Sequence, residues 1–172
     1  TLGLRGVHRI TTGESSPEWE AAQALSAPAR AYLPLPDFNS GTLWNSSMFI
    51  DGSTPALFLA AVLSAALVLA FSVFLTRRPA AAVFYVAGTG AMLAFGMAFD
   101  VGSTRHYGHH YLLLVAALWA AQHVRRVDLP AGLATVQRRI ERPVRGLFLL
   151  ILAIQIVAAA VVFGTDLRIP FS

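Results

Sequence analysis

Apolar residues form four long blocks in this chain, and all of its charged residues lie outside them. The blocks cover about 55–75, 80–99, 107–124 and 146–164. None of them alternates apolar and polar positions with the period of two that is typical of strands. A hydrocarbon core about 30 Å thick requires about 20 apolar helical residues. The pattern therefore predicts an all-α, polytopic membrane protein with four transmembrane helices.

The first 53 residues lack this continuous hydrophobicity. Within them, Glu18 to Ser26 can form a short helix, and Tyr32 to Pro36 is predicted to be extended, because a residue before proline avoids the helical region. We interpret 1–53 as an irregular extracytoplasmic segment and 54–172 as a four-helix membrane domain.

The composition agrees with lipid as part of the solvent. Of the 172 residues, 56% are hydrophobic and 13% are charged, and the mean hydropathy is +0.61. A soluble domain carries about 25% charged residues, so this chain has too little polar surface to cover a water-soluble bundle. The sequence contains no cysteine, which excludes disulfides, zinc thiolate sites and cysteine nucleophiles.

All thirteen basic residues are arginines, and the net charge is +4. Arginine without lysine, in an alanine-rich chain, indicates a GC-rich bacterial genome. The arginines flank the apolar blocks and form no stripe interleaved with aromatic residues, so no nucleic-acid partner is predicted. The lipid bilayer is the expected partner.

The arginines also orient the helices. Arg77 and Arg78 lie between the first two blocks, and six more arginines lie in 125–145, so these two connections hold eight of the thirteen. An even number of crossings separates the two connections, which places them on one side of the membrane, and the positive-inside rule makes that side cytoplasmic. We expect a bacterial inner-membrane protein with both termini of this chain outside.

The 125–145 connection has an amphipathic pattern. Its apolar residues share one helical face: Leu129, Leu133, Val136 and Ile140. Arg138, Arg139 and Arg142 lie on the other side. This indicates a cytoplasmic helix, ended by Pro143, that lies on the membrane with its arginines toward anionic lipids. A solvated loop helix fits the same pattern.

The chemically most distinctive segment lies at the expected outer end of the third block and holds Arg105, His106, His109 and His110. On a helix, His106 lies one turn from both His109 and His110. Such a cluster could bind an anionic group of a substrate, chiefly through Arg105. It equally suits an interfacial anchor, in which the polar ends of these side chains lie at the level of the lipid headgroups. His106 and His110 are the pair that could ligate a metal, but the spacing fixes no third ligand, so no metal site is predicted.

No cofactor is predicted either. His109 and His123 are separated by about 21 Å along a helix, a spacing that would suit two stacked haems between paired helices. The other three blocks contain no matching histidine. Gln155, inside the fourth block, is expected to form an interhelical hydrogen bond.

Several segments carry a resemblance. They are Tyr32 to Pro36 with Leu43 to Asn45, Gly102 to His109 leading to Leu118-Trp119, and Asp166 to Ser172. Together they resemble a group of large, uncharacterised bacterial multi-span membrane proteins with an Arg-His-x-Gly-His segment. The resemblance implies no named activity and no catalytic residue. It covers the C-terminal half of longer proteins, so we expect the remainder of a longer chain as a partner.

Two functional classes remain open, and the sequence does not decide whether the protein is an enzyme. In the first, the protein binds or processes an anionic or lipid-linked envelope substrate at the outer face through the cluster, with Asp37, Asp51 or Asp100 as the candidate base. Polytopic lipid-linked glycosyltransferases work in this way. In the second, the protein is a non-catalytic scaffold or assembly subunit. Catalysis predicts that Arg105→Ala abolishes function at normal protein level, whereas a scaffold predicts loss only when folding or partner recovery falls.

The orientation can be tested with single cysteines at Thr76, Thr104 and Thr135, because the chain has no cysteine of its own. An impermeant thiol reagent on intact cells is expected to label the cysteine at Thr104 alone. Labelling at Thr76 or Thr135, but not at Thr104, would invert the topology and remove the outer-face substrate from consideration.

Overall fold

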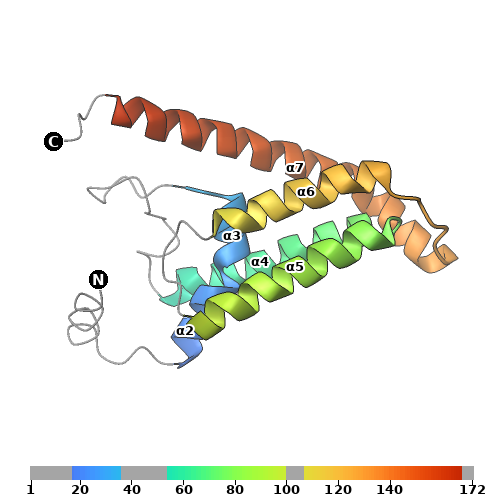
Figure 1. The fold of residues 1–172 in the computed structure, drawn as a ribbon, viewed down its shortest axis with the longest axis horizontal. Helices are drawn as coiled ribbons and strands as arrows, with labels where there is room; N and C mark the ends of the chain where they lie inside the picture. The colour runs from blue at the N-terminus through green and yellow to red at the C-terminus, as the bar shows by residue number, and fades with distance from the viewer. Residues whose placement is uncertain (1–16, 36–53, 100–106, 168–172) are drawn as a thin grey trace.

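The computed structural model describes residues 17–35, 54–99 and 107–167, and within these ranges every regular element is a helix (Figure 1). The helices are α2 (Pro17–Leu25), α3 (Ala27–Tyr32), α4 (Thr54–Leu75), α5 (Pro79–Phe99), α6 (Gly108–His123) and α7 (Ala131–Asp166). The prediction of an all-helical protein is confirmed for the described residues. α2 matches the helix expected over Glu18 to Ser26 to within one residue at each end.

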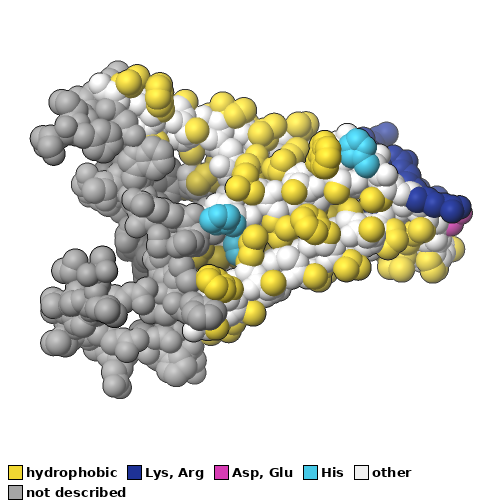
Figure 2. All heavy atoms as spheres, viewed as in Figure 1, with side chains coloured by type: hydrophobic (Ala, Val, Ile, Leu, Met, Phe, Trp, Pro, Cys, Tyr) yellow, Lys and Arg dark blue, Asp and Glu magenta, His cyan; other side chains and the backbone are white. Residues whose placement is uncertain are grey.

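Three of the helices are long and apolar enough to cross a membrane: Pro55–Leu75, Pro79–Ala98 and Ala131–Thr165. Their apolar side chains point outward as well as inward. Leu59, Val62 and Val83 are about two-thirds exposed, at 65%, 66% and 66%. Hydrophobic side chains cover the visible face of the bundle between its two ends (Figure 2). Such a surface is stable in lipid and not in water, as expected for a membrane protein. α6 has 16 residues, and its prediction as a fourth span stays a prediction.

The two arginine-rich connections meet at one end of the bundle. The backbone N–H of Val127 donates a hydrogen bond of 2.8 Å to the carbonyl of Arg77, and Gln137 Nε2 donates one of 3.3 Å to the carbonyl of Phe74. Arginine side chains, in dark blue, gather there in Figure 2. Both connections therefore lie at one end of the bundle, and their placement on the cytoplasmic side of a membrane stays a prediction. We call this the arginine end, and we call the opposite end, where α6 begins with His109 and His110, the histidine end.

Pro143 does not end a helix, contrary to the prediction. α7 runs without a break from Ala131 to Asp166 and contains Pro143, so the connection and the fourth apolar block form one helix. Proline removes one backbone donor and costs a helix about 3 kcal/mol. Contacts on both sides offset this cost: Gln137 bonds to α4, and Val144 is buried in the core.

Part of the N-terminal segment packs inside the bundle. α2 packs against α4 and α5, and α3 packs against α4 and α6. α6 makes its close contacts with α5 and α3, and α7 with α4. α3 therefore lies between α4 and α6 and packs against both of them. The sequence predicted neither α3 nor its burial.

α5 and α6 pack closely at Gly88. A Cβ at this position would lie 2.8 Å from both terminal methyl carbons of Leu113, whereas one at Gly90 would meet nothing within 4 Å. The missing side chain at Gly88 lets Leu113 of α6 approach the backbone of α5, as small residues do in membrane helix packing.

Candidate functional site

α3 is a single short helix with all six of its residues buried: Ala27, Pro28, Ala29, Arg30, Ala31 and Tyr32. Its sequence suits a place between larger helices. Pro28 stands in the first turn, where its missing N–H costs nothing, and the three alanines allow close approach. Six residues are too few to form a stable helix alone, so α3 depends on the contacts that surround it.

Two side chains from the long helices bind the backbone of α3. Ser64 Oγ of α4 accepts a hydrogen bond of 2.8 Å from the Ala29 N–H. Gln155 Nε2 of α7 donates one of 2.6 Å to the Ala31 carbonyl. Both groups belong to the ends of α3, where helical backbone lacks partners of its own. The prediction that Gln155 forms an interhelical hydrogen bond is confirmed, with α3 as the partner.

A pair of tyrosines fixes the C-terminal end of α3. The hydroxyls of Tyr32 and Tyr85 are 2.7 Å apart and hydrogen-bonded, and both side chains are fully buried. The Tyr32 ring also packs edge-on against Phe71 of α4, with 6.1 Å between ring centroids. Because a buried hydroxyl without a partner is costly, each tyrosine stabilises the other's position.

Arg30 is the unusual residue of α3. Its side chain is 3% exposed, and its guanidinium carbon lies 3.8 Å from the centroid of the Tyr107 ring, at the start of α6. A cation over an aromatic face is stabilised by the ring quadrupole, more strongly when water is excluded. A buried charge between apolar helices is nevertheless expensive, and such residues mark functional sites by default.

The two described histidines of the predicted cluster have different environments. His109 is exposed, whereas His110 is 4% exposed. Within the described ranges, no side chain or backbone group forms a hydrogen bond with His110 Nδ1. His110 lies three residues after Tyr107, so the two side chains share one face of α6. We call Arg30 and Tyr107, which are in contact, together with His110 one turn further along α6, the buried basic site.

The other predicted site residues lie outside the described residues: Asp37, Asp51, Asp100, Arg105 and His106. In the part of the chain that the structure describes, no three His, Asp or Glu side chains come together as a metal site would require. The sequence analysis missed Arg30. In the sequence, Arg30 is a single cation in a stretch of alanine, proline and tyrosine. This pattern does not show that its side chain is buried.

Comparison of the chain with protein-family models, with curated proteins and with solved structures found no match. The functional argument therefore rests on the buried basic site.

The tyrosine pair can be tested by a double-mutant cycle with Tyr32→Phe and Tyr85→Phe. Each single change leaves a buried hydroxyl without its partner and is expected to lower the free energy of unfolding by about 1 to 3 kcal/mol. The double change removes both hydroxyls, so its cost should fall below the sum of the single costs by about 1 kcal/mol. Thermal or denaturant unfolding in detergent measures this difference. Additive costs would show that the hydroxyls do not bind each other.

Proposed function

We propose that this protein is a four-span bacterial inner-membrane protein that binds the anionic group of a lipid-linked envelope substrate at its outer face. The observation that supports this proposal most directly is the burial of Arg30 on α3, against Tyr107. The anion would bind at the buried basic site, and the sequence-predicted Arg105, His106 and His109 would supply further positive charge at its entrance.

The proposed topology uses α6 as the fourth span. α6 lies alongside α5, which is itself long enough to cross a membrane. By the positive-inside rule, the arginine end faces the cytoplasm, so the histidine end faces outward. α2 and α3 then form a re-entrant segment from the outer side. Ser64, which bonds to α3, lies about 15 Å from the start of α4, near the middle of the span. Short helices at such depth are tolerated where protein surrounds them.

The chemistry of Arg30 suits a phosphate or carboxylate group. The Arg30 guanidinium lies over the Tyr107 ring, with 3.8 Å between its central carbon and the ring centroid. Its five N–H donors lie in the plane of the group, so one arginine can stack on an aromatic ring and bind an anion at the same time. Water exclusion strengthens the charge-assisted hydrogen bonds that result.

The proposal has a binding part and a catalytic part. Binding requires the buried basic site. Catalysis additionally requires a base, for which Asp37, Asp51 and Asp100 remain the candidates. In a scaffold, Arg30 would contribute to folding alone, so a binding measurement separates the two classes.

Binding can be measured by native mass spectrometry of the purified protein with a polyprenyl phosphate, and with the uncharged polyprenol as the reference ligand. Arg30→Gln is expected to weaken polyprenyl phosphate binding about tenfold, as loss of one charge-assisted hydrogen bond does. Polyprenol binding should not change. Arg139→Gln, which removes an exposed arginine from α7, is the charge-matched control and should bind as the unaltered protein does.

Equal binding by Arg30→Gln and the unaltered protein would contradict the proposal. A variant that loses thermal stability but keeps its preference for the phosphate over the polyprenol would support the scaffold. Arg30→Lys keeps the positive charge and serves as a second variant if Arg30→Gln does not fold.

A further inference from the structure

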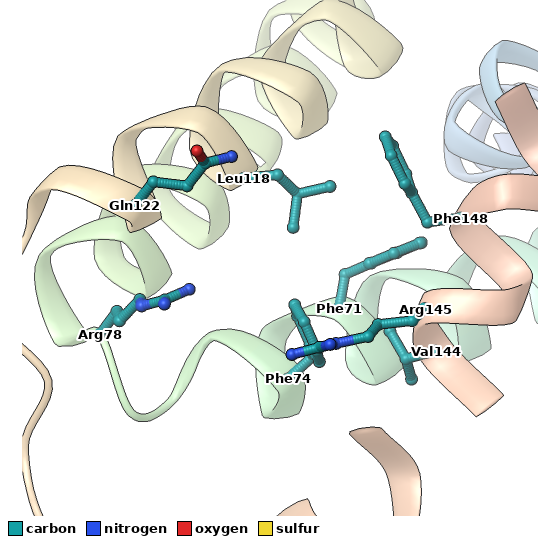
Figure 3. Close-up of a pocket in the computed structure, with 8 residues that line it drawn as sticks. All are labelled: Phe71, Phe74, Arg78, Leu118, Gln122, Val144, Arg145 and Phe148. Carbon is teal, nitrogen blue, oxygen red and sulfur yellow. The ribbon is translucent and has the colours of Figure 1, made fainter. Parts of the chain in front are cut away.

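A cavity of about 280 Å³ lies at the arginine end, between α4, α6 and α7 (Figure 3). No residue of α3 and none of the buried basic site lines it. Its floor and walls are apolar: Phe71, Phe74, Leu118, Val144 and Phe148. Three polar side chains complete the lining: Arg78, Gln122 and Arg145.

The cavity follows from the position of α3. α3 lies between α4 and α6, and its last residue, Tyr32, packs on Phe71. Phe71 also lines the cavity. The inserted segment thus ends where the cavity begins. Nearer the histidine end, α3 fills the space between α4 and α6. α3 does not extend to the arginine end, so α4, α6 and α7 enclose an open space there.

The polar side chains of the cavity converge from different elements. Arg78 belongs to the turn after α4, Arg145 to α7 and Gln122 to α6. In Figure 3 the side chains of Arg78 and Arg145 extend toward each other across the apolar residues. Glu141 holds Arg145 in place through a 2.6 Å ion pair with its Nη2. A guanidinium has five donors, so Arg145 can bind a second anion in addition to Glu141.

The charges around Arg78 favour an anion. Partial burial lowers the pKa of Arg78, and the nearby positive charges of Arg126 and Arg145 lower it further, while Glu141 acts in the opposite direction. Positive charge therefore exceeds negative charge at this place. An anion between Arg78 and Arg145 would relieve the repulsion between them.

We propose that this cavity binds one phospholipid with an anionic headgroup from the leaflet at the arginine end, with the phosphate between Arg78 and Arg145 and an acyl chain along Phe71, Phe74 and Phe148. The combination of a charged rim and an aromatic floor matches an amphiphile. A soluble phosphate would use the arginines alone. The proposal is independent of the outer-face substrate, because it involves none of the residues of the buried basic site.

Native mass spectrometry of the whole protein can test the site, with phosphatidylglycerol as the probe and phosphatidylcholine as its zwitterionic reference. The protein is expected to retain one phosphatidylglycerol in preference to phosphatidylcholine. Arg78→Gln with Arg145→Gln should weaken this binding about tenfold or more. Arg138→Gln with Arg139→Gln removes the same charge from arginines of α7 that the sequence predicts to face anionic headgroups but that do not line the cavity; this pair should lower general attraction to anionic lipid and still retain the one bound phosphatidylglycerol.

A second variant separates the lipid chain from the charge. Leu118→Trp fills the cavity from α6 without changing any charge, and it should also weaken phosphatidylglycerol binding; this variant still tests the site if the arginine pair is needed for folding. Equal loss of lipid in both arginine pairs would show diffuse surface attraction and overturn the proposal. Displacement of the lipid by millimolar glycerol phosphate, which has the headgroup without the chains, would show a soluble-anion site and overturn it as well.

Discussion

The hydrogen bonds between the backbone of α3 and the side chains of Ser64 and Gln155 are the interactions on which this architecture depends. A backbone N–H or carbonyl buried among apolar helices without a partner costs several kcal/mol in lipid. α3 is too short to satisfy both of its ends internally. Ser64 accepts from Ala29, and Gln155 donates to Ala31. These two polar side chains make it possible for a six-residue helix to lie inside the bundle.

Two features of the molecule follow from that insertion. At the histidine end, α3 brings Arg30 to a buried position on Tyr107, which a surface segment would not do. At the arginine end, the space that α3 leaves unfilled is bordered by Phe71, on which Tyr32 packs from the other side. One inserted helix thus supports both the proposed substrate site and the proposed lipid site.

The sequence predicted the long helices because lipid-facing helices need continuous apolar composition, which requires no knowledge of their neighbours. It could not predict α3, because the partners of this helix lie 35 and 124 residues away in sequence. Pro143 was wrongly predicted to end a helix, since docking of α7 on α4 outweighs the local effect of proline. In the candidate site, the histidine cluster was visible as a motif, and His109 and His110 lie at the start of α6. Arg30 was missed because its burial depends on tertiary contacts alone.

The most direct test is hydrogen exchange of the backbone amides of residues 27–33 in lipid nanodiscs. The inserted position predicts exchange at Ala29, Arg30 and Leu33 as slow as at the centre of α4, because these three amides are hydrogen-bonded and α3 is buried. Ser64→Ala should accelerate exchange at Ala29, and exchange elsewhere in α4 should stay slow. Exchange at the rate of an unstructured peptide over 27–33 would show that α3 lies outside the bundle, and it would remove the structural basis of the buried basic site.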